Sequence, residues 1–165
     1  MPNAWIFVTP MVGLQAIDAT ETSALITLGT RVQAKHATYG VGEFIYLKGV
    51  ASTAVGSWVT YNSDDHSTTL LAANAIGAVG IAMSANVANQ YGWYQIYGKG
   101  IGKALTGYVD NALVYATATA GSIDDAVVSG DRVKNAIGAS AVDTPSSGFA
   151  EFEIYYPIMD DGSAT

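Results

Sequence analysis

Cysteine is absent from the 165 residues, and charged side chains are scarce. Without cysteine the chain has no disulfide scaffold, no thiolate zinc site and no cysteine nucleophile. Lysine and arginine number 7 against 14 aspartates and glutamates, which gives a formal net charge of −7. A protein that binds nucleic acid through its phosphates needs a basic face. No nucleic-acid partner is therefore expected.

The low charge has a second consequence. Charged residues make up 13% of the chain and hydrophobic residues 50%, whereas ordinary soluble domains carry about 25% charged residues. Such a composition predicts that neighbouring subunits cover part of the surface. All of the net charge lies in residues 110–165, which hold nine acids and two bases. We interpret this third as a solvated acidic end, with a face that meets a basic partner as the alternative.

Targeting and membrane-spanning segments are not expected. The opening MPNAWIFVTP lacks a basic region, and Pro10 interrupts its apolar stretch. The uncharged segment Leu70–Ala88 approaches spanning length. Its Asn74, Ser84 and Asn86 and its many alanines favour two buried strands with a turn near Asn74 over a membrane helix. No membrane partner is predicted.

Short runs of β-branched and aromatic residues, separated by turn residues, predict an all-β fold. Their spacing is typical of a sandwich or a barrel, and we expect one small β-barrel domain over residues 25–159. The clearest strands are Trp5–Thr9, Leu28–Ala34, Glu43–Val50, Ser57–Tyr61, Ala78–Met83, Tyr91–Tyr97, Gly102–Gly107, Ala112–Thr117, Ala136–Val142 and Phe149–Tyr156. Helical turns are expected at most in Ser84–Asn89 and, more strongly, in Asp124–Asn135.

The two ends are expected to lie outside this domain. Residues 1–24 are predicted to form an extended N-terminal arm and residues 160–165 a frayed tail. Within the arm, Trp5, Ile6, Phe7 and Val8 are too apolar to remain in water. We predict that they pair with another chain, as a strand added to the edge of its sheet.

Motifs for catalysis are weak. Gly98–Ala104 (GKGIGKA) lacks the spacing of a phosphate loop and its magnesium-binding hydroxyl, and is interpreted as a bend where backbones approach closely. Asn62–His66 combines two acids with a histidine; a solvated turn is favoured over a cation site or an acid-based enzyme site. Glu151 and Glu153 are interpreted as a solvent face rather than a catalytic dyad. Neither an enzyme activity nor a metal or other cofactor is expected.

The aromatic stretch Tyr91–Tyr97 (YGWYQIY) predicts packing in a core and a subunit interface, because tyrosine and tryptophan are enriched at interfaces. A platform for sugars or bases is the alternative.

Several segments share an order and spacing with one family. These segments are Leu28–Ala34 (LGTRVQA), Gly42–Lys48 (GEFIYLK), Ala78–Ala82 (AVGIA), Gln90–Gly98 (QYGWYQIYG) and Val114–Gly121 (VYATATAG). In this order they resemble the small capsid decoration, or cement, proteins of tailed phages. The resemblance runs from about residue 25 to residue 145.

The resemblance implies a non-enzymatic virion protein with a β-barrel or β-tulip fold. It would be assembled in the host cytoplasm, form a homotrimer on the outer capsid surface, and clamp neighbouring major capsid subunits against the pressure of packaged DNA. In such a trimer, Tyr91, Trp93, Phe152 and Tyr156 are expected to form the core or the trimer seam. The alternative is a head-fibre or tail-associated host-binding protein whose tyrosines contact sugars.

Overall fold

The computed structural model describes residues 5–8 and 13–161, and in these ranges the chain forms strands, turns and bends but no helix. The predicted all-β class is confirmed. The strands are β1 (Trp5–Phe7), β2 (Arg31–His36), β3 (Gly40–Lys48), β4 (Trp58–Tyr61), β5 (Thr68–Leu70), β6 (Gly77–Ala82), β7 (Tyr91–Lys103), β8 (Leu113–Ala116), β9 (Ile123–Asp124), β10 (Arg132–Gly138) and β11 (Phe149–Met159).

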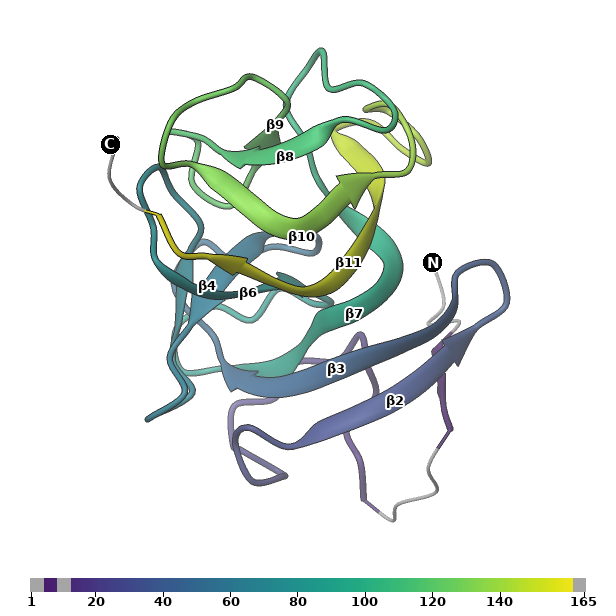
Figure 1. Cartoon of the computed structure of the whole chain (residues 1–165). Helices are drawn as coiled ribbons and strands as arrows, with labels where there is room; N and C mark the ends of the chain where they lie inside the picture. Colours follow the sequence, from purple (N-terminus) through teal and green to yellow (C-terminus); the bar gives the residue numbers. More distant parts are fainter. Residues whose placement is uncertain (1–4, 9–12, 162–165) are drawn as a thin grey trace.

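All these strands join one antiparallel sheet. Its order is β1-β2-β3-β7-β6-β11-β10-β8-β9, with β4 paired to β6, β5 paired to β4, and an additional pairing of β7 with β11. Within the described residues the end strands β1 and β9 do not pair, so the sheet is not closed. Figure 1 shows two lobes, one around β2 and β3 and the other around β8, β10 and β11.

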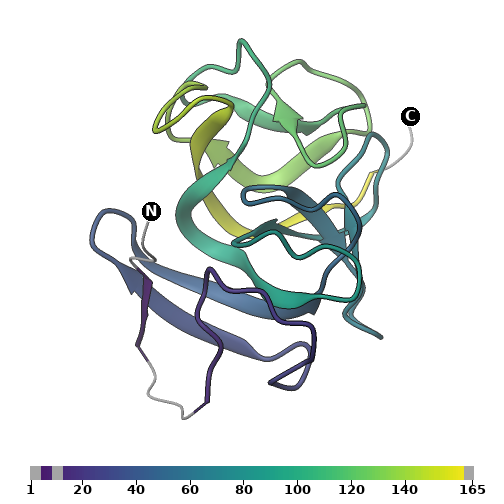
Figure 2. The same ribbon diagram turned by 180° about the vertical axis from the view of Figure 1, so that it is seen from behind.

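Strand β7 connects the two lobes. Its first half pairs with β3 and its second half with β11, and the strand curves from one lobe to the other (Figures 1 and 2). The bend lies at Gly98, whose φ is +100° and where an added Cβ would lie 2.7 Å from the carbonyl oxygen of Val41. Only glycine fits this conformation and this close approach without strain. The expected strands Tyr91–Tyr97 and Gly102–Gly107 are therefore parts of one strand that ends at Lys103.

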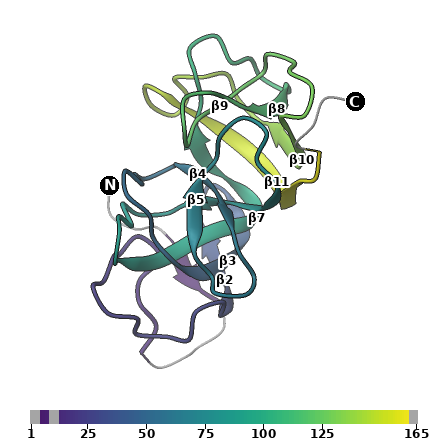
Figure 3. The same ribbon diagram turned by 90° about the vertical axis from the view of Figure 1, so that its left-hand side faces the viewer.

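Three apolar clusters fill the molecule. The first joins Phe44, Tyr46 and Trp93 to residues 13–30, which cover one face of the β2–β3 ladder (Figure 2). The second fills the other lobe around Trp58 and Phe152, whose rings meet edge to face at 5.0 Å. The third includes residues of β3, β4, β6 and β7, with the β4–β5 hairpin seen between the lobes in Figure 3.

The prediction of helical turns in Ser84–Asn89 and Asp124–Asn135 is wrong. Residues 132–138 form β10, and residues 84–89 form bends and a turn. Two acids of the second segment accept hydrogen bonds from loop amides: Asp125 from the amide of Val109 at 3.0 Å, and Asp131 from the amide of Asn74 at 2.6 Å. Asn74 has a φ of +58° between β5 and β6, which confirms the predicted turn.

Alkaline pH should destabilise this fold. Burial raises the pKa of Tyr94 to about 12, whereas an unfolded tyrosine ionises near pH 10. The native state therefore holds this proton more tightly. The contribution of Tyr94 to the free energy of unfolding is fully present below about pH 10, and it is lost as the pH rises towards about 12. Urea unfolding between pH 9 and 12 should show this decline, and it should be smaller in Tyr94→Phe. Equal declines in the two proteins would show that ionisation of Tyr94 is not the cause.

Candidate functional site

The outward face of the β7–β11 ladder combines aromatic, apolar and charged side chains. Its cross-strand pairs place Tyr97 opposite Tyr155, Lys99 opposite Glu153, Ile101 opposite Glu151, and Lys103 opposite Phe149. Partners in such pairs point to the same side of a sheet, and alternate residues to opposite sides. The intervening Ala150, Phe152 and Ile154 are buried in the core. We call these eight residues the ladder face.

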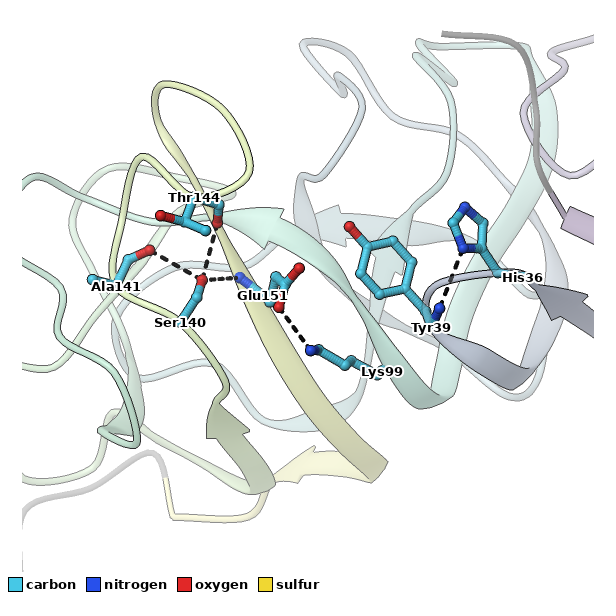
Figure 4. A network of polar contacts seen from close by, with 7 residues as sticks. All are labelled: His36, Tyr39, Lys99, Ser140, Ala141, Thr144 and Glu151. Atoms are coloured by element: carbon cyan, nitrogen blue, oxygen red, sulfur yellow. Dashed lines mark hydrogen bonds and ion pairs between the residues drawn. The ribbon is translucent and has the colours of Figure 1, made fainter.

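The middle of the ladder face is an ion-paired network (Figure 4). The Lys99 ammonium lies 2.7 Å from the Glu151 carboxylate, and the Glu151 amide donates to the hydroxyl of Ser140 at 2.8 Å. The Tyr39 ring, on the β2–β3 hairpin, lies 5.9 Å from the Lys99 ammonium. Burial, followed by the charge of Glu151, raises the pKa of Tyr39. The network thus brings the hairpin of one lobe against strand β11 of the other.

An apolar cavity of about 180 Å³ opens beside this network. Aromatic rings from three parts of the chain line it, those of Trp5, Tyr39 and Phe149. The Trp5 and Tyr39 rings stack at a centroid distance of 6.5 Å. Gln95 is also in the lining, and its Nε2 donates to two carbonyl oxygens of the β7 bend. This amide therefore braces the bend.

Three tyrosines, Tyr97, Tyr155 and Tyr156, gather at the other end of the ladder face, and we call them the tyrosine patch. The Tyr97 ring centroid lies 5.6 Å from that of Tyr155 and 5.4 Å from that of Tyr156. Their exposed fractions are 38%, 47% and 48%. Large contiguous apolar patches on a protein surface often mark binding sites. This patch is the most distinctive surface feature of the ladder face.

Both outer tyrosines of the patch donate to carboxylates. The hydroxyl of Tyr156 donates to Glu43 at 2.5 Å, and that of Tyr155 donates to Glu153 at 3.3 Å. The charge of Glu153 raises the pKa of Tyr155, and the hydrogen bond to Glu43 raises that of Tyr156. The phenols thus stay neutral near pH 7 and keep both carboxylates at the rim of the patch.

The predicted arm residues lie on the sheet of their own chain. Trp5, Ile6 and Phe7 form β1, which pairs with His36, Lys35 and Ala34 of β2. The amide of Val8 donates to the carbonyl of Gln33 at 2.9 Å. Ile6 and Val8 are exposed, and β1 is an edge strand of the described sheet. Pairing of this segment with another chain stays a prediction.

The four residues expected at the core or seam are separated. Trp93 and Phe152 are fully buried, in different clusters. Tyr91 is partly buried against the cluster of Trp93. Tyr156 lies on the exposed tyrosine patch. The structure therefore places two of the four in the core of the chain and one on its surface.

The Asn62–His66 loop is held by hydrogen bonds of its own. The Asn62 side chain accepts from the amide of Asp64 at 2.8 Å, and Asp65 accepts from the amide and the hydroxyl of Ser67. These Ser67 hydrogen bonds are the main cause that lowers the pKa of Asp65. Among residues 5–8 and 13–161, no three histidine, aspartate or glutamate side chains gather in a way that could hold a metal ion.

The sequence points to Tyr97 only as the last residue of the aromatic stretch Tyr91–Tyr97, and it does not point to Tyr155 or Glu43 as site residues. The alternation of residues 149–155 does place Tyr155 and Glu153 on one face. Nothing local shows that Tyr97 and Glu43 lie beside them, because that depends on how β3, β7 and β11 pair.

Comparisons with known proteins give no match: no protein-family model, curated protein or solved structure matches this chain. In the part of the chain that the structure describes, no helix is long and apolar enough to span a membrane.

Proposed function

We propose that this chain is a non-enzymatic decoration protein of a tailed-phage capsid. In this proposal it forms a homotrimer on the outer surface of the expanded head, and it clamps neighbouring major capsid subunits. The finer fold expected with this role, a β-barrel or β-tulip, belongs to the same proposal. The proposal starts from the ordered sequence motifs between about residues 25 and 145 that resemble those of cement proteins.

The observation that carries a binding role is the ladder face. It presents the exposed Tyr97 and Tyr155 and the partly exposed Ile101 and Phe149 on two paired strands, next to an apolar cavity. Tyrosine and tryptophan are enriched at protein interfaces. Glu151 and Glu153 each have a partner, Lys99 and Tyr155 respectively. The face is thus better suited to contact than to acid–base catalysis.

The clamp would act by mass action. A protein that binds only the expanded lattice stabilises that state by a free energy that grows with the logarithm of the ratio of its concentration to its dissociation constant. A trimer that engages several capsid subunits at once multiplies weak individual contacts through a high effective concentration. Exposed Ile6 on the edge strand β1, and Val8 directly after this strand, would offer one further contact to a neighbouring chain.

The copy number per virion tests the proposal. Quantitative mass spectrometry of virions purified from the source should give a ratio near one copy per major capsid subunit, because a lattice clamp occupies every equivalent position. A few copies per particle would favour the head-fibre or tail-associated alternative, and glycan binding by the tyrosines would be measured next. Complete absence from virions would overturn both virion functions.

A further inference from the structure

We propose that the tyrosine patch binds a guanidinium group, that of an arginine side chain presented by a partner protein. The identity of that partner as a capsid subunit rests on the proposed function. The recognition of the cation does not, because it follows from the rings and the charges of the patch itself.

Aromatic geometry is the first support. A guanidinium over the face of a tyrosine is attracted by the negative face of the ring, and arginine makes this contact more often than lysine. Tyr97 lies between Tyr155 and Tyr156, edge to face with the first at 78° and tilted by 39° against the second. Because the rings are not coplanar, a cation can sit over an exposed ring face, which is negative, and away from the positive ring edges.

The backbone conformation of Tyr156 brings its ring to the same surface as those of Tyr97 and Tyr155. In an alternating strand, Tyr156 would point to the same side as the buried Phe152 and Ile154. Its φ is +51°, and the pairing of β10 with β11 shifts register at this point. A bulky residue in the left-handed region is rare and costs free energy. Strained residues of this kind cluster at functional sites, which is consistent with selection for an exposed Tyr156.

Charge complementarity selects a cation. Glu43 and Glu153 lie at two sides of the patch. Glu43 accepts a hydrogen bond from the hydroxyl of Tyr156, and Glu153 accepts one from that of Tyr155. The positive charge nearest to Glu43 is Arg31, 3.9 Å from its carboxylate and half exposed. Glu43, Glu153 and Arg31 sum to −1, and Lys99, opposite Glu153, is paired with Glu151 and adds no net charge, on a chain of −7. This surface therefore attracts positive groups.

Arginine fits better than lysine. Its planar guanidinium stacks on aromatic rings and presents five N–H donors that match carboxylates, and it is more weakly hydrated than an ammonium. A carboxylate that already accepts one tyrosine hydroxyl retains lone pairs for such donors. A single arginine side chain can thus contact a ring of the patch and a carboxylate at its rim.

The test is an NMR titration of the full chain with the peptide acetyl-Gly-Arg-Gly-amide. We expect saturable shifts of the ring protons of Tyr97, Tyr155 and Tyr156, with weaker binding at higher salt because the contact is partly electrostatic. The matched peptide with citrulline has the same shape but no charge, and it should bind at least about threefold more weakly. Equal binding of the two peptides, or no saturable shift, would overturn the proposal.

Variants locate the site. Tyr155→Leu and Glu153→Gln alter exposed side chains, and each should weaken binding of the arginine peptide at least about threefold. Asp64→Asn removes the same charge from an exposed turn elsewhere and should leave binding unchanged. An equal loss in Asp64→Asn would show bulk attraction alone and overturn the assignment. This result is separate from the virion copy number: a chain absent from virions can still bind the peptide, and a virion protein can fail to do so.

Discussion

Replacing Trp93 by alanine is expected to lower the free energy of unfolding by about 3–5 kcal/mol, the usual cost of removing a buried aromatic side chain. Trp93 has no exposed surface, and its ring centroid lies 5.1 Å from that of Tyr46 and 6.1 Å from that of Phe7. Its indole N–H also donates to the carbonyl of Gln15 at 2.8 Å. Alanine therefore leaves a cavity and an unpartnered carbonyl. For a chain of this length the melting temperature should fall by about 6–20 °C.

Two controls separate the causes of this loss. Trp93→Phe retains an aromatic ring but removes the N–H, so its loss should be smaller. Tyr155→Ala removes a half-exposed ring that packs on Tyr97 and should cost clearly less, about 0.5–1.5 kcal/mol. Light scattering on the folded protein shows whether Trp93→Ala changes the oligomer. A buried position predicts that the oligomer is unchanged; lost assembly at an unchanged melting temperature would place Trp93 at a subunit seam instead.

Local patterns predict most of the strands but not their ends or joins. The run Phe149–Tyr156 alternates polar and apolar residues, and β11 follows it and extends it to Met159. The prediction divided β7 at its glycines, because glycine usually interrupts a strand. Those glycines instead permit the bend at Gly98, where the backbone of Val41 approaches. Strands β5 and β9 have three and two residues and carry too little pattern to be recognised.

The tyrosine patch shows why a surface site is harder to predict than a core. A strict two-residue period assigns Tyr156 to the buried side with Phe152, and the positive φ of Tyr156 reverses that assignment. The meeting of Tyr97 with Tyr155 requires strands far apart in the sequence to pair in one register. The burial of Trp93, by contrast, agrees with its apolar and aromatic surroundings in the sequence, and local composition points to it.

Replacing Gly100 by alanine is expected to destabilise the bend of β7. A Cβ at this position would lie 2.0 Å from the side-chain oxygen of Gln95, well inside any real contact distance. The Gln95 amide donates to the carbonyls of Tyr97 and Lys99 at 3.2 and 3.0 Å. Overpacking of this kind costs about 1–3 kcal/mol. If the amide moves away to relieve the clash, each carbonyl that loses its donor costs about 1–3 kcal/mol more.

Gly80→Ala is the matched control for this substitution. Gly80 also lies in a buried strand, and neither glycine has a positive φ. At Gly80, however, the nearest atoms to an added Cβ lie at 3.4 Å, an ordinary contact distance. Urea unfolding should therefore show a clear loss of stability for Gly100→Ala and a small change for Gly80→Ala. Similar losses would mean that the close approach of Gln95 is not the cause.

A double-mutant cycle then identifies the colliding side chain. Gln95→Ala alone should be destabilising, because the carbonyls of Tyr97 and Lys99 lose their donor. In that background the three side-chain atoms of Gln95 that lie nearest to the added methyl group of Gly100→Ala are gone. The cost of Gly100→Ala should then fall by at least about 1 kcal/mol, a coupling typical of side chains in direct contact. An equal cost in both backgrounds would show that the bend at Gly98–Gly100 does not depend on the Gln95 brace, and that glycine is required there for the backbone alone.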